Sequence, residues 1–253
     1  MLEQLRKSID ELALKKNLSP ELVKTCLERA VEGAVCEFFE IRECDADVED
    51  GIIMGYFHVG EDMGLSEAWW FYDWSFYGDV IPVEFTFMMF EEIPPVVERT
   101  RELFERIVEE VGADELVKKW RAKVHQAVEG VIKARHGDWI EVELGDEARG
   151  VMPRRRWVKR ETASYRRGKL MYFYVVKVSK VVGGVDVELS RGSIGLPAAL
   201  ITHVAPWVKV KSVRRIAGRK SWVVADTRLP AAMLREVSRM LGGEVIEVNT
   251  GPA

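Results

Sequence analysis

The chain of 253 residues is long enough for two or three domains, and its 47% hydrophobic content can support ordinary cores. No apolar run is long enough to cross a membrane, and the charged amphipathic start is not a signal peptide, so we expect a cytoplasmic protein without membrane contact. The net charge of −4 is divided unevenly. Residues 1–120 hold 12 Lys and Arg against 28 Asp and Glu, a net charge of −16, whereas residues 121–253 hold 25 against 13, a net charge of +12. The basic half therefore suits RNA or DNA, and the acidic half suits a protein partner or solvent.

The first third of the chain mixes helix and strand patterns. Apolar residues near helical spacing predict a helix over residues 1–17. Ser19-Pro20 begins a second helix, because serine can cap a free N–H and proline is tolerated at the first helical position. Asp50-Gly51 predicts the turn of a hairpin, and residues 80–87 have a further strand pattern.

Seven aromatic residues crowd the short span between residues 69 and 77. If these side chains are exposed, they form an apolar patch of the kind that marks a surface for a partner protein. If they are buried, they belong to a hydrophobic core. The span has neither a clear helical period nor a clear strand period. We expect core or half-buried packing there.

A long amphipathic helix begins at Pro94-Pro95. We expect Gly112 to interrupt it and Asp114 to cap a continuation. The change from acidic to basic composition falls along this connector. The sequence therefore predicts a domain boundary near residue 125, with an N-terminal domain of helices and strands over residues 1–125.

Five short strand patterns follow between residues 126 and 192. Apolar and polar residues alternate in each, and Gly183-Gly184 marks a hairpin between the last two. Five short strands after a helical connector are typical of an OB-type β-barrel. The chain as a whole is thus expected to be α+β and multidomain.

A basic and aromatic segment lies between the third and fourth of these strands. Cations beside aromatic rings suit a ligand made of phosphates and flat bases, so we expect this segment to bind RNA. A solvated charged loop is the alternative. The candidate residues are Arg154, Arg155, Arg156, Trp157, Lys159, Arg160, Arg166, Arg167 and Lys169.

Strand alternation adds three aromatic candidates. Trp139, Tyr172 and Tyr174 each lie on the opposite strand face from the neighbouring aliphatic residues. If the aliphatic faces form the barrel core, the three rings point outward and can stack on unpaired bases. The alternative for each ring is a packing role at the barrel rim.

Residues 193–253 have the pattern of a small α/β domain: helix, strand, strand, helix, strand. The second helix begins after Pro230 and ends at Gly242-Gly243. The domain is basic, and its first strand supplies secondary RNA-binding candidates. These are Lys209, Lys211, Arg214 and Arg215.

Nothing in the residue spacing indicates an enzyme. The sequence has no metal-ligand spacing, no Ser/His/Asp or Cys/His arrangement and no complete phosphate-binding loop, so we expect no metal, no cofactor and no catalytic activity. The three sparse cysteines are expected to be reduced thiols with packing roles. His136, in a predicted turn, is expected to be structural or to contact RNA.

The runs GVMPRRRWV, YRRGKLMYFYVVKV and GVDVELSR, followed by GLPAALITHVAPWVKVKSVRRIAGRKSWVVA, resemble the NusA family of bacterial transcription factors. The earlier run VEFTFMMFEEIPPVVERTRELFERIVEEV is similar to the strand and connector helix of that family. The resemblance covers nearly the whole chain.

This resemblance implies an N-terminal domain that docks on RNA polymerase, an OB-type barrel that binds nascent single-stranded RNA, and a KH-like domain. Such a factor would modulate pausing, termination or antitermination. The GXXG loop with which a KH domain grips the RNA backbone is missing between VVADTR and LPAAMLREVSRMLGG, so the KH-like domain is shortened. A general RNA-binding protein acting in translation, ribosome assembly or RNA turnover is the alternative.

Overall fold

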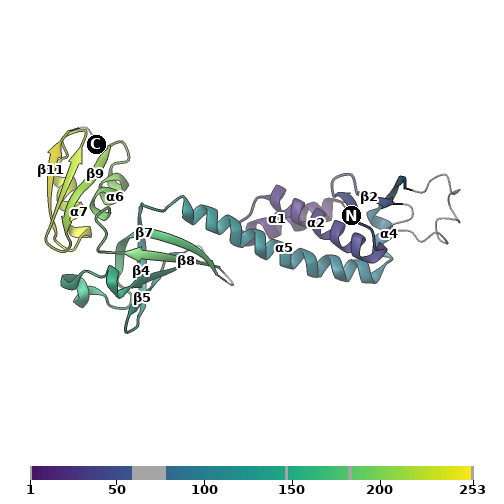
Figure 1. Cartoon of the computed structure of the whole chain (residues 1–253), viewed down its shortest axis with the longest axis horizontal. Coiled ribbons are helices and arrows are strands. Elements are labelled where there is room, and N and C mark those ends of the chain that lie inside the picture. Colours follow the sequence, from purple (N-terminus) through teal and green to yellow (C-terminus); the bar gives the residue numbers. More distant parts are fainter. Residues whose placement is uncertain (1, 59–77, 146–147, 182–183, 252–253) are drawn as a thin grey trace. The chain divides into compact units, whose positions relative to one another are not determined.

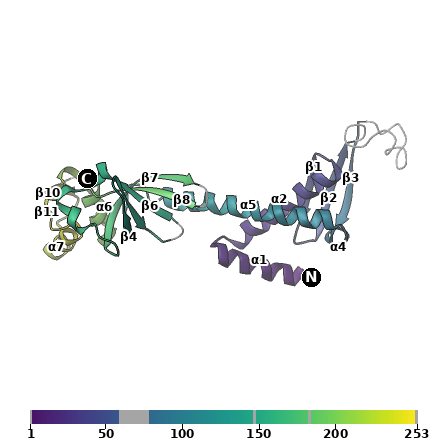
Figure 2. The ribbon, with the colours of Figure 1, turned by 90° about the horizontal axis from the view of Figure 1, so that it is seen from below.

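The computed structural model describes residues 2–58, 78–145, 148–181 and 184–251. The chain is α+β, as predicted, and divides into two compact units, Met1–Gly112 and Ala113–Ala253. Unit 1 combines helices with a small sheet, and unit 2 contains a barrel and a second small sheet (Figure 1 and Figure 2). The boundaries expected near residues 125 and 192 stay predictions. The crowded aromatic span between residues 69 and 77 lies outside the described residues.

Unit 1 begins with two helices, α1 (Leu2–Lys16) and α2 (Pro20–Phe39). The predicted cap of α2 is confirmed, since the Ser19 hydroxyl accepts a hydrogen bond from the Leu22 N–H at 3.3 Å. A three-stranded antiparallel sheet follows in the order β1-β2-β3, formed by β1 (Glu43–Asp47), β2 (Ile52–His58) and β3 (Val80–Thr86). The predicted hairpin at Asp50-Gly51 joins the first two strands, and a short helix that the sequence did not indicate, α4 (Phe87–Glu91), follows the third.

The long helix α5 (Pro94–Arg121) is continuous, so the predicted interruption at Gly112 is wrong. A glycine inside a helix costs about 1 kcal/mol relative to alanine. Apolar side chains on both sides of the glycine offset this cost: Val108 is 3% exposed and Val117 is 5% exposed. Burial therefore decides the course of the helix here, and not local propensity.

The five strands predicted between residues 126 and 192 form a closed barrel in the order β4-β5-β6-β8-β7, with β7 pairing back onto β4. All neighbouring strands are antiparallel except β6 and β8, which are parallel. Gly183 of the expected hairpin lies outside the described residues. The strands are β4 (Ala127–Arg135), β5 (Trp139–Glu143), β6 (Ala148–Pro153), β7 (Leu170–Val181) and β8 (Gly184–Ser190).

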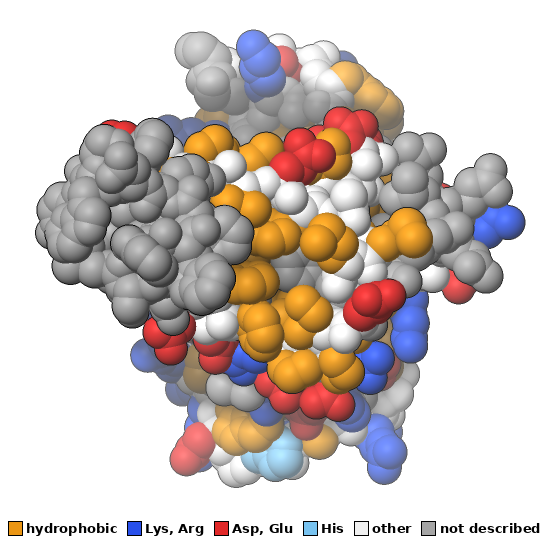
Figure 3. Space-filling model, turned by 90° about the vertical axis from the view of Figure 1, so that its right-hand side faces the viewer, with side chains coloured by type: hydrophobic (Ala, Val, Ile, Leu, Met, Phe, Trp, Pro, Cys, Tyr) orange, Lys and Arg blue, Asp and Glu red, His pale blue; other side chains and the backbone are white. Residues whose placement is uncertain are grey.

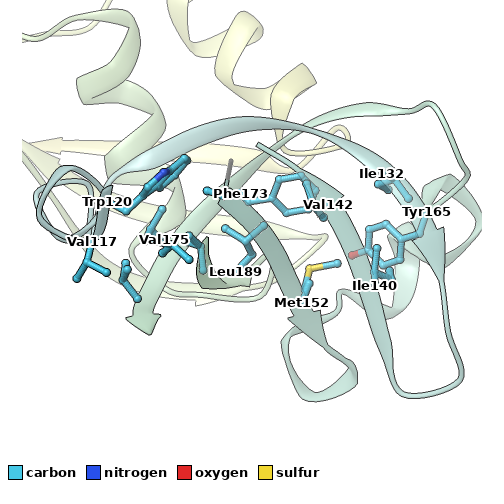
Figure 4. Packing of buried hydrophobic residues seen from close by; sticks show 14 residues of the cluster. Val117, Trp120, Ile132, Ile140, Val142, Met152, Tyr165, Phe173, Val175 and Leu189 are labelled. Carbon is cyan, nitrogen blue, oxygen red and sulfur yellow. The ribbon is translucent and has the colours of Figure 1, made fainter. Parts of the chain in front are cut away.

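The barrel interior is filled by the aliphatic strand faces that the alternation pattern identified (Figure 4). Ile140, Val142, Phe173 and Val175 are fully buried in this core. Trp120, at the end of α5, joins the same cluster with 1% of its surface exposed. Its indole N–H is buried without a hydrogen-bond partner among the described residues.

The rest of unit 2 follows the predicted order of elements and forms a second sheet in the order β11-β10-β9. Helices α6 and α7 share one core with a single face of this sheet, where Val223 and Ala225 are buried. The elements are α6 (Leu196–Val204), β9 (Val210–Ile216), β10 (Lys220–Ala225), α7 (Ala231–Met240) and β11 (Val245–Thr250).

Across the described part of the chain, every helix is too short or too polar to span a membrane.

Candidate nucleic-acid interface

The basic segment between β6 and β7 is a folded structure and not an open loop. It forms two short 3-10 helices, η2 (Arg154–Arg156) and η3 (Lys159–Ser164). Tyr165 is 2% exposed and anchors the segment to the barrel core. Its hydroxyl accepts a hydrogen bond from the Val158 N–H at 3.0 Å and donates one to Glu161 Oε2 at 3.2 Å. Burial and the nearby Glu161 carboxylate raise the pKa of this phenol, which keeps it protonated as a donor.

Glu161, the one acid among the cations of the segment, forms a buried ion pair with Arg191. Arg191 Nε donates to Glu161 Oε2 at 2.8 Å, and its Nη1 and Nη2 donate to the carbonyls of Tyr172 at 2.6 Å and Met240 at 3.1 Å. The Arg191 side chain is completely buried. Because these three partners lie on η3, β7 and α7, the pair fixes the basic segment against both the barrel and α7.

A second buried ion pair corrects one of the sequence expectations. Arg215 was a candidate RNA contact, but its side chain is 1% exposed and forms a two-pronged pair with Glu244 at 2.9 and 3.0 Å. Its Nη1 also donates to the carbonyl of Arg191 at 2.8 Å, which links the two ion pairs. Arg215 is therefore a structural cation, because its hydrogen bonds are already satisfied inside the fold.

The cations on the outer side of the basic segment differ in how much charge they offer to a ligand. The side chains of Arg154 and Arg155 are 72% and 71% exposed, although each has an acidic neighbour, Asp138 at 3.5 Å and Glu188 at 3.2 Å respectively. Arg156 is 35% exposed and also pairs with Glu188, at 3.1 Å. The most available charges are five exposed cations of the segment that pair with no described carboxylate: Lys159, Arg160, Arg166, Arg167 and Lys169.

Trp139 lies beside this basic segment on an aromatic platform. Its indole stacks on the His136 ring, with centroids 4.0 Å apart and an interplanar angle of 21°, and the Arg149 guanidinium lies over the indole at 6.0 Å. The Arg154 N–H donates to the Asp138 carbonyl at 2.7 Å, which joins the turn between β4 and β5 to the start of the segment. The outward direction predicted for Trp139 agrees with the complete burial of Ile140, its neighbour on the strand.

Tyr172 and Tyr174 also point away from the barrel core, as expected, but they are not open stacking surfaces. Both rings pack against the core shared by α6, α7 and the second sheet. Tyr172 lies 5.4 Å from the His203 ring, and a Cβ atom on Gly195 would come within 2.7 Å of the Tyr174 ring. Burial raises the pKa of both phenols. These contacts favour a packing role for both tyrosines over base stacking, between the barrel and the C-terminal layer formed by α6, α7 and the sheet β11-β10-β9.

Trp157, the aromatic residue inside the basic segment, is also engaged by the fold. Its indole N–H donates to the Met152 carbonyl at 3.0 Å, and the ring packs against the barrel core. The Arg135 guanidinium covers the ring at 5.0 Å. These contacts favour an anchoring role for Trp157 over base stacking.

The sequence analysis did not single out Arg149, which lies over the Trp139 indole, or Trp222 on β10, which lies beside two cations. Both lie on the polar face of their strands, so the alternation that identified Trp139 was the available signal. The described residues contain no group of three or more His, Cys, Asp and Glu side chains that could hold a metal ion.

No protein-family model matches the chain, and no curated protein matches it. Among solved structures, an uncharacterized protein from Methanocaldococcus jannaschii matches over 26% of this chain and 85% of its own length. The identity is 12% and the TM-score is 0.23, a similarity too low to support an argument about fold or function.

Proposed function

We propose that this chain is a NusA-like transcription elongation, termination or antitermination factor, in which the barrel binds nascent single-stranded RNA and unit 1 docks on RNA polymerase. The main observation in favour of RNA binding is the stacked pair of His136 and Trp139 on the closed barrel. This pair lies beside a folded segment that exposes several cations. Flat rings next to cations suit unpaired bases and phosphates.

The strand order of the barrel supports an OB-type fold. The fifth strand, β8, lies between the third and the fourth, and the fourth pairs back onto the first. In OB folds, strands two and three and the loop between strands one and two bind oligonucleotides. Trp139 begins the second strand and His136 belongs to that loop, so the platform occupies the expected binding region. The element order of residues 196–250 supports a shortened KH-like domain, since residues 226–230 between β10 and α7 contain no glycine.

The outer face of the unit 1 sheet is our candidate for the polymerase contact. Glu43, Asp45 and Glu84 are exposed on this face, and Met54 lies between Asp45 and Glu84 in the strand register. Figure 3 shows hydrophobic side chains gathered on one side of unit 1, with acidic side chains at the edges of the patch. An apolar surface framed by carboxylates suits a partner with a basic rim.

The RNA-binding part is tested with the full chain and a labelled oligouridine of about 12 nucleotides, a length within the range of one to a few OB-type sites. Trp139→Leu should weaken binding by about fivefold or more, the loss expected for one base stack. Trp207→Leu is the matched control, because Trp207 is 76% exposed and lies outside the platform. Equal affinities of the two folded variants would remove the platform from the RNA site.

The polymerase part is tested by binding the full chain to purified bacterial core RNA polymerase at low salt. Lysine at positions Glu43, Asp45 and Glu84 should abolish binding, because each change replaces an attractive charge with a repulsive one. The same change at Glu105, Glu109 and Glu110, exposed acids on α5, is the control with equal net charge. If the unmodified chain binds RNA but not the polymerase, a general RNA-binding protein in translation, ribosome assembly or RNA turnover becomes the better assignment.

A further inference from the structure

The sheet of the C-terminal layer has one face covered and one face open. Ser221, Val223 and Ala225 of β10 face α6 and α7 and are buried. The alternate residues of the strand therefore lie on the other face, where Trp222 and Val224 do not belong to the core shared with α6 and α7 and where Lys211 and Arg214 of β9 are exposed. Trp222 lies at the centre of this open face, paired in register with Arg214 on β9 and with Glu247 on β11.

Cations frame Trp222 on the open face. The Arg214 guanidinium lies 5.2 Å from the indole centroid, and the Lys220 ammonium lies 4.8 Å from it. Lys211 is exposed and pairs in register with Val224, the next β10 residue on this face, so it adds a third positive charge. Glu247 is the one acid on this part of the described sheet, and it pairs with Lys220. The face is thus positively charged around an aromatic centre.

The open face is continuous with the basic segment of the barrel. Gly218, in the turn between β9 and β10, contacts that segment: its carbonyl lies 3.5 Å from Arg160 Nη1, and a Cβ atom on it would come within 2.9 Å of Val158. Exposed Arg219 follows Gly218 directly. A row of cations therefore leads from Arg160 through the turn to Lys220 and the indole of Trp222.

We propose that this open face is a second contact surface for single-stranded RNA, in which a base stacks at Trp222 and phosphates pair with Lys211, Arg214 and Arg219. The inference rests on the proposed RNA-binding function of unit 2 and extends it from the barrel, where Trp139 lies, to the separate sheet β11-β10-β9. Every base has a flat face that can stack on an indole or on an arginine that covers it, so the site needs no particular sequence. An acidic protein would meet the cations equally well but would not need the ring, so the ring is the feature to test.

The experiment measures binding of the full chain to labelled oligouridines of about 6 and about 16 nucleotides. The shorter RNA can occupy only one surface, whereas the longer RNA is meant to contact both the Trp139 platform and the Trp222 face. Trp222→Leu, which keeps an apolar side chain but removes the stacking ring, should weaken binding of the longer RNA by about fivefold or more. Trp222→Phe should restore much of the loss, because a phenyl ring still stacks. Trp207→Leu is the control for an exposed tryptophan elsewhere in the same layer, and thermal unfolding verifies that each variant is folded.

The outcomes separate this surface from the barrel site. Loss of long-RNA affinity in Trp222→Leu, with rescue by Trp222→Phe, supports the second surface. Unchanged RNA affinity in the folded Trp222→Leu variant overturns it, while a loss in Trp139→Leu would still support the barrel site. Failure of the unmodified chain to bind either RNA would overturn the proposed function itself. If Trp222→Leu does not fold, Lys211→Gln with Arg214→Gln replaces it, and an unchanged salt dependence in that variant also overturns the proposal.

Discussion

At the scale of single residues, unit 2 contains two kinds of cation, buried and exposed, that the composition of the sequence does not distinguish. Arg191 and Arg215 are buried and paired with Glu161 and Glu244. Lys159, Arg166, Arg167 and Lys169 are exposed and have no carboxylate partner in the described part of the chain. A buried arginine whose donors are satisfied stabilises the fold, whereas an exposed one is available for phosphate.

Replacing Arg166, Arg167 and Lys169 together by glutamine should flatten the salt dependence of RNA binding. Each phosphate contact on a single strand contributes about −0.7 to the slope of log affinity against log salt, so the slope should fall in magnitude by about 1 to 2. The measurement is a titration of single-stranded RNA at several salt concentrations. Arg101→Gln with Arg106→Gln is the comparison, since both are exposed cations of α5 outside the proposed RNA-binding surfaces and should change the slope less. An unchanged slope in the triple variant would show that the segment is a solvated charged surface.

Trp120 allows the effect of its unsatisfied N–H to be separated from the effect of losing most of its ring. Its ring is buried at the end of the barrel core, and its N–H has no partner among the described residues. Trp120→Phe removes the unsatisfied donor and should leave the stability within about 1.5 kcal/mol of the original chain. Trp120→Ala should cost about 3–5 kcal/mol, because it leaves a large cavity. Urea unfolding of both variants measures the difference, and similar large losses in both would mean that the N–H has a partner.

At the scale of elements, the two buried ion pairs connect segments that are far apart in sequence. Glu161 belongs to η3, Arg191 follows β8, Arg215 lies on β9 and Glu244 precedes β11. Their hydrogen bonds also include the backbone of Tyr172, Met240 and Gly218. Breaking a buried pair by removing one partner commonly costs about 3–5 kcal/mol, so these contacts fix the C-terminal layer against the barrel.

Stability should fall in acid because of Glu244. Burial tends to raise the pKa of this carboxyl group, but hydrogen bonds from Arg215, Ser221 and the Gly218 N–H outweigh that effect and hold the pKa below its ordinary value of 4.5. A group with a lowered pKa in the folded state stabilises the fold fully above its unfolded value. Its contribution is lost as the pH falls from about 4.5 through the folded pKa.

The measurement is the free energy of unfolding from pH 7 to pH 3, compared between the original chain and Glu244→Gln. The variant should be less stable at pH 7 and should lose less stability on acidification. Parallel pH profiles of the two proteins would contradict this assignment of the acid sensitivity to Glu244.

At the scale of the whole molecule, the acidic half and the basic half of the chain present chemically different surfaces. The described sheet of unit 1 presents carboxylates around apolar side chains, whereas unit 2 presents cations around Trp139 and Trp222. Within unit 2, the barrel and the C-terminal layer share Tyr172 and Tyr174 as common packing residues. The C-terminal layer should therefore be required for a stable barrel, whatever its own contribution to RNA binding.

Ending the chain after residue 205 should destabilise the barrel as well as remove the second sheet. The truncation would expose Tyr172 and Tyr174 and would remove Met240 and Arg215, which bind the Arg191 side chain and backbone. We expect a lowered thermal midpoint for the remaining barrel and a weaker near-UV circular dichroism signal. A truncated chain with an unchanged midpoint would show that the barrel folds independently of the layer that covers it.

The sequence by itself determined most of the elements of this protein, because the signals for them are local. The serine–proline start of α2 and the alternating strands of the barrel depend on neighbouring residues, and both predictions were confirmed. Burial of Ile140 and Phe173 also followed from alternation, since a strand places successive side chains on opposite faces.

Only the tertiary structure decided which outward side chains remain accessible. Tyr172 and Tyr174 have the same alternation signal as Trp139, but a layer formed more than 20 residues later covers them. Alternation places Arg214 and Arg215 on opposite faces of β9, but only the fold brings Glu244 to Arg215 on the covered face. Gly112 carries a local signal for a helix break that the burial of Val108 and Val117 overrides. In each case the deciding contact joins residues that no local pattern connects, so sequence periodicity could not reveal it.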